Sequence, residues 1–375
     1  MKKLLTIFAI VILLIITGAV AWSLYLTRNP IPKTTSQFVT VGVIFNGSKY
    51  DGGWNEAQYR GFESIKDDVN VRFVYVENVQ PDEAEIVPVM RELIQRNHAT
   101  IIFGPSYDYG PAILKVAKEY PQVKFFYMGN WKTADNVATC FGRIYQQRYL
   151  TGIVAGLQTK TNHIGYVASY PLPEIYRGIN AFALGVRSVN PQAVIHVKWS
   201  GTWNDGDVET AATTAMLDVY PIDVMTHHQN TVYPLQVAQR RHVYAIGYNI
   251  DRSQEFPDIF LTAPVWNWGA FFKERINECL EGRFQAKAYF ESIGHVSAIA
   301  PLSPLVRPDA RAKVAEAEKR LSTTNWDVFY GPIYDQQGNL RVREGENISD
   351  AELVQHFDWF VQGVEEMGPR PALNQ

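Results

Sequence analysis

The chain has 375 residues, 46% of them apolar, which is enough for two lobes that each bury a core. Its formal charge of −3 leaves no basic surplus of the kind that nucleic-acid binding needs. The two cysteines, Cys140 and Cys279, lack the spacing of a zinc or redox motif, while a single disulfide between them stays open. These features exclude a nucleic-acid partner and a cysteine-built metal site, and we expect no cofactor.

The N-terminal segment carries an address signal. Two lysines precede an apolar run from Leu4 to about Gly18, and a small-residue cleavage site begins at Ala19, as in a secretory signal peptide. The apolar character continues to Leu26, so the stretch is also long enough to span a bilayer as an uncleaved anchor. We expect residues 1–28 to be a signal peptide or N-terminal membrane anchor and 29–37 a linker. Both alternatives place the body in the periplasm or at the outer face of the cytoplasmic membrane.

Residues 39–65 predict a strand, a loop and a helix that starts near Gly53. The loop brings together Asp51, Trp54 and Asn55. In an α/β protein it lies at the carboxyl end of the first strand, where small ligands bind. A tryptophan beside a carboxylate and an amide suits a flat, hydrogen-bonding ligand. The alternative is that the tryptophan packs the helix onto the sheet and Asp51 caps the helix.

The rest of the chain alternates between strand-like and helix-like segments. Strands are predicted at 71–76, 100–103, 123–128, 163–168, 193–199, 222–226 and 243–246, with strand-like residues at 288–300 and a hairpin at 334–340. Helices are predicted at 83–96, from 111, and at 149–159, 174–189, 208–217, 233–240, 269–279, 309–321 and 349–364. This alternation predicts an α/β fold with two parallel, doubly wound sheets flanked by helices, and a cleft between two lobes.

The loops that follow the strands supply further candidate ligand contacts. Tyr107 and Tyr109 lie in the second loop, Gln229 and Asn230 at a strand end, and Asn249 after the strand at 243–246. Aromatic rings can stack on a flat ligand, and amides offer both a donor and an acceptor to its edge. We expect the fold to bring these loops together.

Several residues have competing interpretations. Trp266 and Trp268 alternate along an extended segment, so we expect one ring in the cleft, favouring Trp266, and the other in the core. Glu174 and Arg177 could reach the ligand or form a pair at the start of a helix.

Metal-binding and catalytic motifs are not evident. His227 and His228 are adjacent on a strand and should face opposite ways, and we expect no metal. The sequence shows no nucleophile elbow, deaminase motif or phosphate loop, so we expect no enzyme and no catalytic residue.

Several long motifs occur in an order that resembles the basic membrane protein family. They are GWN in the first loop, FGRIYQQRYLTGIVAG, IGYVASYPLPEIYRGINAFALGVRSVNP, YAIGYN and LTAPVWNWG. This family consists of type I periplasmic proteins that bind substrates for ABC importers, and it includes purine-nucleoside receptors. The resemblance implies a first lobe from 38–142 and 265–293 and a second from 143–264 and 294–375. It also implies three crossovers, near 141–143, 263–266 and 293–298, about which the lobes close.

The resemblance also assigns functions to individual residues. In the nucleoside receptors the first loop reads D-x-S-F-N, and Asp51, Trp54 and Asn55 match its ligand-binding positions, with tryptophan for phenylalanine. Asn249 and Trp266 stand where the receptors carry an aspartate and a lysine that hold the ribose hydroxyls. Both ribose-holding charges are therefore missing, which favours a free base or another flat heterocycle over a nucleoside.

These observations predict a substrate-binding protein of an ABC importer. It is expected to capture a purine base or purine nucleoside-like solute between its lobes and to deliver it to permease subunits, acting as a monomer. The alternative is a membrane-anchored sensor or regulator that uses the same pocket, tethered through its N-terminal segment.

Overall fold

The computed structural model describes residues 38–129 and 132–372. The predicted signal peptide or anchor and the linker lie outside the described residues. Within the described ranges, no helix combines the length and the apolar character needed to cross a bilayer. Residues from Thr40 onward form one compact unit.

The first of two six-stranded sheets has the strand order β12-β5-β4-β3-β1-β2. Its strands are β1 (Val39–Ile44), β2 (Val71–Val76), β3 (Ala99–Gly104), β4 (Lys124–Met128), β5 (Val137–Gly142) and β12 (Ala288–Glu291). Its helices are α2 (Trp54–Glu63), α3 (Glu83–Gln95), the 3-10 turn η1 (Tyr107–Tyr109), α4 (Gly110–Glu119) and α9 (Gly269–Leu280). The pairings β12-β5, β5-β4, β4-β3 and β3-β1 are parallel, α3 packs on α4, and α2 packs on α9. We call this sheet with its helices the first lobe.

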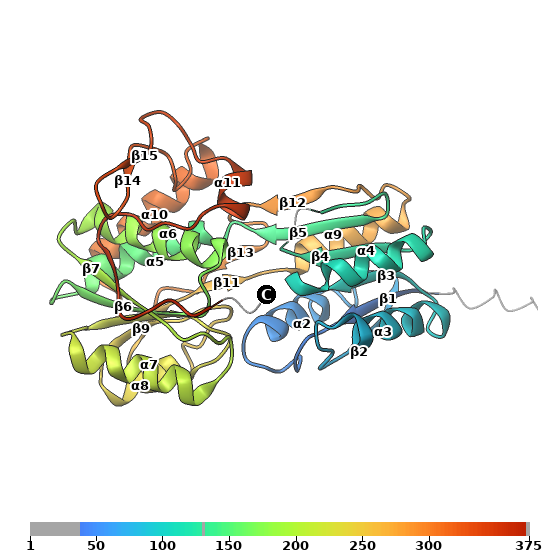
Figure 1. Ribbon diagram of the computed structural model, residues 1–375, viewed down its shortest axis with the longest axis horizontal. Helices are drawn as coiled ribbons and strands as arrows, with labels where there is room; N and C mark the ends of the chain where they lie inside the picture. The colour runs from blue at the N-terminus through green and yellow to red at the C-terminus, as the bar shows by residue number, and fades with distance from the viewer. Residues whose placement is uncertain (1–37, 130–131, 373–375) are drawn as a thin grey trace, which may run out of the picture. The chain divides into compact units, whose positions relative to one another are not determined.

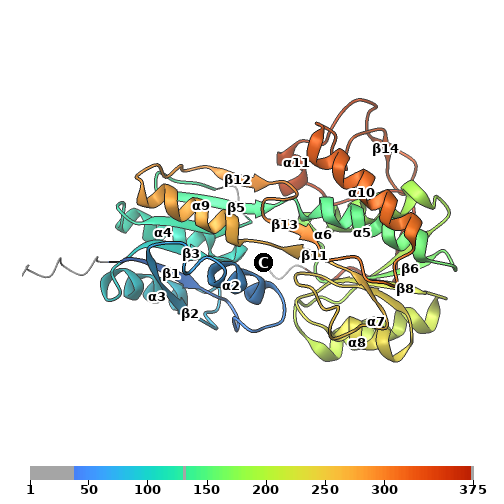
Figure 2. The ribbon, with the colours of Figure 1, turned by 180° about the vertical axis from the view of Figure 1, so that it is seen from behind.

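The second sheet has the order β10-β9-β8-β6-β7-β16, and every pairing in it is parallel. Its strands are β6 (His163–Ala168), β7 (Val194–Trp199), β8 (Val224–His228), β9 (Tyr244–Ile246), β10 (Phe260–Thr262) and β16 (Val364–Glu366). Its helices are α5 (Ile144–Gln158), α6 (Pro173–Val189), α7 (Gly206–Val219) and α8 (Tyr233–Arg240). Helices α5 and α6 cover one face and α7 and α8 the other (Figures 1 and 2). We call this sheet with its helices the second lobe.

Two crossing strands pair with each other outside the sheets. Strand β11 (Pro264–Trp266) follows β10 and leads into α9, and β13 (Ser297–Ile299) follows β12. They are antiparallel, with Val265 opposite Ala298. The remaining elements are α10 (Pro308–Thr323), the antiparallel hairpin β14 (Ile333–Tyr334) and β15 (Leu340–Val342), and α11 (Asp350–Gln355).

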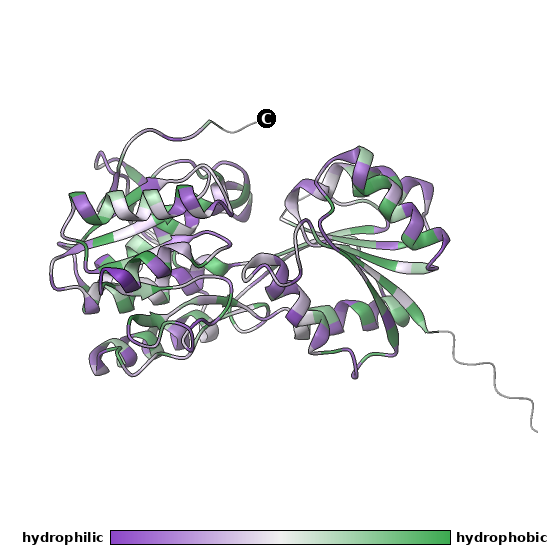
Figure 3. Ribbon diagram, turned by 90° about the horizontal axis from the view of Figure 1, so that it is seen from below, coloured by the Kyte–Doolittle hydropathy of each residue, from purple (hydrophilic) through white to green (hydrophobic). Residues whose placement is uncertain are grey.

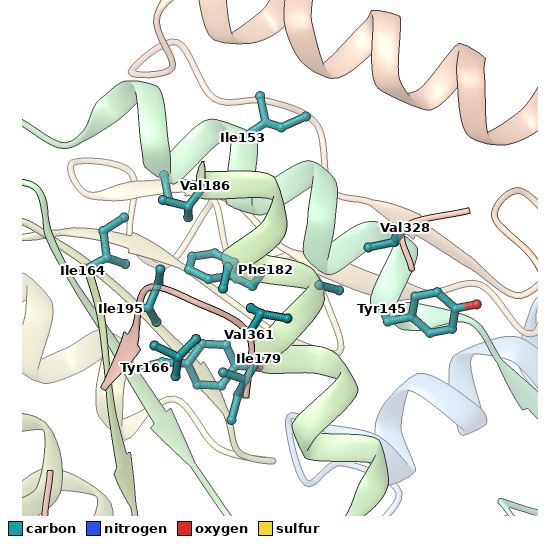
Figure 4. Packing of buried hydrophobic residues seen from close by; sticks show 14 of the residues in the cluster. Tyr145, Ile153, Ile164, Tyr166, Ile179, Phe182, Val186, Ile195, Val328 and Val361 are labelled. Carbon is teal, nitrogen blue, oxygen red and sulfur yellow. The ribbon is translucent and has the colours of Figure 1, made fainter. Parts of the chain in front are cut away.

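Buried apolar side chains explain why these elements assemble. The central strands are almost continuously buried, as expected for parallel strands covered on both faces, and Figure 3 shows them largely in the hydrophobic colour. In the second lobe, Phe182 of α6 belongs to one cluster with Ile164 and Ile195 from the sheet (Figure 4). Helix α7 begins at Gly206, slightly before the predicted start at 208, because the Asp205 carboxylate accepts hydrogen bonds from the backbone of Asp207 and Val208.

The predicted α/β fold of two parallel sheets is confirmed, and the differences lie in single elements. The helix predicted at 349–364 is wrong, because α11 ends at Gln355 and the chain returns as β16. Gly363, with a φ of 86°, precedes β16. Glu365 and Glu366 make this edge strand polar, so its sequence does not indicate that it pairs with β7. The strand-like residues 288–300 form two strands, one in the first sheet and one crossing.

Candidate functional site

The loop between β1 and α2 is held by Asp51. Its carboxylate accepts hydrogen bonds from the backbone N–H groups of Gly53 at 2.8 Å and Glu56 at 3.0 Å, and from the side chain of Asn55 at 2.9 Å. Asp51 therefore caps α2, as one of the two interpretations of the sequence proposed. Asn55 is buried, and its Oδ1 has no hydrogen-bond partner.

Trp54 lies in a cluster of rings that combines the first sheet with a crossing strand. Its indole Nε1 donates to the Pro105 carbonyl at 2.6 Å, which fixes the ring. The ring centroid lies 6.0 Å from that of Phe141, at the end of β5, and 5.4 Å from that of Trp266, on β11. Phe141 and Trp266 are themselves 5.3 Å apart. The sequence predicted both Trp54 and Trp266 as ligand contacts, but it did not predict Phe141 as one.

The two tryptophans after β10 do not point to opposite faces, which corrects that expectation. Trp266 and Trp268 stack with their centroids 5.0 Å apart and their planes 17° from parallel. Strand β11 ends at Trp266, and Trp268 already has the backbone angles of the helix that begins at Gly269, so the strand alternation stops between them. Trp268 is fully buried, as the core alternative required, while Trp266 is 7% exposed.

Three predicted amide residues of the second lobe lie together at the ends of β8 and β9. Asn249 donates from Nδ2 to Oδ1 of Asn230 at 3.1 Å and accepts from the Trp266 indole at 3.1 Å. Gln229 donates to the Ser200 hydroxyl, but its Oε1 is buried without a partner. The buried Ser169 hydroxyl after β6 also has no partner.

Four further side chains line this end of the second sheet. Glu174, the second residue of α6, places Oε1 3.7 Å from Nε2 of His228 at the end of β8. The Tyr248 ring lies 4.3 Å from the His228 ring and 4.2 Å from the guanidinium of Arg148. Arg148 is fully buried and donates to the His227 carbonyl at 3.0 Å. The sequence offered no signal for Arg148 or Tyr248, and His228 was considered only as a metal ligand.

Burial sets the protonation of these groups. It lowers the pKa of His227 to about 3 and that of His228 well below its usual value, with Arg148 acting in the same direction. Burial raises the pKa of Glu174, while Arg177 and Arg148 oppose the shift. Within residues 38–129 and 132–372, no cluster of histidine, cysteine or acidic side chains could hold a metal ion. Cys140 and Cys279 are free thiols.

Arg177 links the second lobe to the first. Its guanidinium lies 5.8 Å from the Phe141 ring and donates to the Leu353 carbonyl at 2.9 Å. A small opening between the lobes is lined by both Arg177 and Phe141. A groove of about 250 Å³ is lined by Trp266 and Trp268 together with Gly61 of α2.

The structure does not bring Tyr107 and Tyr109 into this site. Tyr109 is fully buried in the core of the first lobe, where its hydroxyl donates to the Val79 carbonyl. Tyr107 is 59% exposed and packs beside Gly129. Both belong to the turn η1, whose tight backbone turns one ring inward and the other outward.

The lobes touch directly at the first loop. Arg252, in the loop after β9, donates to the Gly52 carbonyl and pairs with Glu255. Asp251 is exposed and accepts from the backbone of Ser253, so it is a turn residue. The candidate site therefore draws on both lobes: it combines aromatic rings from the first lobe and β11 with polar side chains from the second lobe.

Two parallel doubly wound sheets joined by crossing strands define a type I periplasmic substrate-binding fold. Residues 38–290 match the Bmp family, described as ABC transporter substrate-binding protein PnrA-like. The chain belongs to this family. The family is a non-catalytic one, and it implies a small-molecule ligand and an ABC permease as partners.

Individual relatives support the same assignment. The chain is 33% identical to a purine-binding protein of Brucella abortus over 88% of its own length and 94% of the relative's. It is 32% identical to a Haloferax volcanii protein described as an ABC transporter glucose-binding protein, over 84% of its length and 77% of the relative's. A solute-binding protein of an ABC transporter from Conexibacter woesei has a similar fold, with a TM-score of 0.67 at 21% identity, covering 77% of this chain and 98% of that one.

Proposed function

We propose that the chain captures a flat, purine-like heterocycle between its two lobes and delivers it to an ABC permease. The observation that carries this proposal is the aromatic wall of Trp54, Phe141 and Trp266, which meets polar side chains of the second lobe through the bond from Trp266 to Asn249. Stacking on aromatic side chains contributes about 1–3 kcal/mol per base in nucleic-acid sites. Such a wall favours a flat ligand.

Unpartnered polar atoms support a ligand with hydrogen-bonding edges. Asn55 Oδ1, Gln229 Oε1 and the Ser169 hydroxyl are buried without partners. Leaving such a group unpaired costs about 1–3 kcal/mol, so a bound molecule that donates to them gains that energy. The three atoms come from both lobes, and a ligand that meets all of them is bound fully only when the lobes are closed.

A free base fits these contacts better than a nucleoside. Asn249 and Trp266, which stand at the ribose-holding positions of the nucleoside receptors, hydrogen-bond to each other. Neither supplies a charge for a cis-diol, and their mutual bond leaves less capacity for sugar hydroxyls. The printed name of the Brucella abortus relative, a purine-binding protein, supports the same ligand class.

Capture works through hinge closure at the crossings near 141–143, 263–266 and 293–298. A ligand that contacts both lobes shifts the population of conformations toward the closed one. The permease then recognises the closed form. Proteins with this function are exported, so we place the binding domain outside the cytoplasmic membrane.

Calorimetric titration of refolded, ligand-free protein tests the ligand class. The panel is adenine, hypoxanthine, guanine, adenosine, guanosine and glucose, the last because of the Haloferax volcanii relative. We expect a base to bind tightly and the nucleosides at least tenfold more weakly. Tight binding of nucleosides without binding of bases would reject the free-base ligand, and binding of glucose alone would reject the heterocycle.

The second candidate is a sensor with the same pocket. The chain is 25% identical over 76% of its length to a Bacillus subtilis protein named transcriptional activator protein med. Mapping the mature N-terminus separates the two functions. A mature protein that begins near Trp22 supports a released binding protein, whereas an intact N-terminal segment supports an anchored sensor.

A further inference from the structure

Glu174 presents a carboxylate that the protein itself does not use. The side chain is 28% exposed and sits in the first turn of α6, at the carboxyl end of the second sheet. Among the described residues it forms no hydrogen bond, and its ion-pair neighbour is Nε2 of His228, at 3.7 Å, which is beyond hydrogen-bond distance. Arg177, one turn further along α6, gives its Nη1 to the Leu353 carbonyl. The helix-start pair that the sequence allowed is therefore not formed within ion-pair distance.

His228 presents a donor beside this carboxylate. The ring is fully buried, and burial keeps it neutral because it lowers the pKa well below the usual value. Its Nδ1 lies 3.3 Å from the hydroxyl of Tyr166, which is also fully buried. We assign the hydroxyl as the donor in this bond, because a buried phenol O–H needs an acceptor and the described residues offer it no other. The single ring proton then lies on Nε2, which has no hydrogen-bond partner.

An acceptor and a donor therefore stand side by side, too far apart to bond to each other. We propose that Glu174 and His228 together recognise one edge of the ligand. Glu174 accepts a hydrogen bond from a ligand N–H, and the Nε2–H of His228 donates a hydrogen bond to the lone pair of the neighbouring ligand atom. The ligand class is a heterocycle with an amidine or lactam edge, in which a donor and an acceptor are adjacent. Glu174 is the specificity-determining residue of this pair. The inference rests on the proposed function and goes beyond it, because it states which edge chemistry the site selects.

The surroundings suit such an edge. Tyr248 and Trp203 flank His228 with ring centroids 4.3 and 6.3 Å from its own, so the pair is walled by rings. Hydrogen bonds to an ionised acceptor in such a partly dry place are roughly twice as strong as neutral ones. A ligand whose edge is methylated or carries no N–H leaves the carboxylate unpaired and is rejected, as buried polar sites reject analogues that lack the matching group.

The test compares three ligands on wild-type protein and on Glu174→Gln. Adenine offers the full edge, purine lacks the exocyclic amine, and 6-(dimethylamino)purine keeps the nitrogen but has no N–H there. We expect wild-type protein to bind adenine at least tenfold more tightly than the other two, and Glu174→Gln to abolish most of that difference. The control is Glu318→Gln on α10, which makes the same charge change on an exposed surface and should leave all three affinities unchanged.

Thermal unfolding of each ligand-free variant separates a binding effect from a folding effect. A partly exposed glutamate that makes no hydrogen bond should leave the midpoint nearly unchanged when it becomes glutamine. Equal loss of affinity for all three ligands, or no change in adenine affinity, overturns the inference while the proposed function stands. If wild-type protein binds none of the three and also neither hypoxanthine nor guanine, both the inference and the purine-like ligand fail.

Discussion

Gly53 of the first lobe lies against the backbone carbonyl of Asn230 in the second. A Cβ added at Gly53 would lie closer than 3.0 Å to the Asn230 oxygen, a separation that real Cβ atoms essentially never show. The side chain of the same asparagine accepts a hydrogen bond from Asn249. The absence of a side chain at Gly53 therefore lets the two lobes meet at the site.

The first prediction follows from this contact. Gly53→Ala should leave the fold of each lobe intact but prevent full closure, so ligand affinity should fall by about tenfold or more, in line with the energies of clashes in packed interiors. Calorimetry measures the affinity, and small-angle scattering with saturating ligand measures closure. Gly282→Ala is the control, because its added Cβ meets nothing within 4 Å. The φ of 70° at Gly282 means that this control variant loses stability but should bind normally. Normal ligand binding by Gly53→Ala would show that the contact between Gly53 and Asn230 plays no part in closure.

The second prediction concerns the aromatic wall. Trp54→Ala should weaken binding of the heterocycle by about tenfold or more, because one stacked ring contributes about 1–3 kcal/mol. Trp54→Phe should lose less, since it keeps a ring and gives up the hydrogen bond to the Pro105 carbonyl. Trp326→Ala serves as the control, because that ring packs on Arg320 and Tyr149 in the second lobe. An unchanged dissociation constant for Trp54→Ala takes this residue out of the site.

The third prediction concerns the bond between Arg252 and the Gly52 carbonyl. Arg252→Ala should open the closed form and raise the rate of ligand release severalfold, because hydrogen bonds to charged groups contribute about 1.5–3 kcal/mol. Stopped-flow release measures this rate. Arg241→Ala is the matched control, since Arg241 pairs with Asp218 on the surface of the second lobe. Release at the wild-type rate would show that this bond does not hold the lobes together.

The fourth prediction is a pH dependence of stability. Glu209 on α7 is fully buried and interacts with the Thr231 hydroxyl, and burial raises its pKa from 4.5 to about 7. Between these values the folded protein binds a proton that the unfolded chain has released, so the Glu209 contribution to stability is full below pH 4.5 and is lost as the pH rises through about 7.

Glu209→Gln should remove this dependence. Denaturant unfolding at pH 5 and pH 8 should show that the variant gains stability relative to wild type at the higher pH, since the wild-type protein there holds a buried charge. Using the difference between variant and wild type cancels the contribution of His227 and His228, whose lowered pKa values act in the opposite direction. A difference that does not change with pH would show that Glu209 is already ionised at pH 5.

The fold followed from the alternation of strands and helices because each element carries its own apolar pattern. Three strands were missed: β16, whose acidic residues resemble a surface segment, and β5 and β10, for which the sequence pattern predicted no strand. Local patterns also placed Asp51, Trp54 and Asn249 at strand ends, and the structure brings their loops together. Strand ends meet at one edge of a parallel sheet whatever the details of packing, so this much was predictable.

Side-chain direction was less predictable. Tyr107 and Tyr109 occupy a loop of the expected kind, but a single turn decides that one is exposed and the other is in the core. The proximity of Glu174 to His228 depends on how α6 packs on the sheet, and no sequence spacing records that distance. Arg148 lies just before the helix predicted at 149–159, whereas α5 begins at Ile144, and the burial of Arg148 against Tyr248 follows only from the tertiary structure.

The antiparallel pairing of β11 with β13 has a mechanical consequence. Two crossing strands that are locked in register, with Trp266 opposite Ser297, cannot slide past each other without breaking their ladder. Such a ribbon bends and twists far more easily than it shears, so it favours rotation of the lobes over sliding. Because Trp266 belongs to the ribbon, the ring that hydrogen-bonds to Asn249 of the second lobe moves with the ribbon when the ribbon bends.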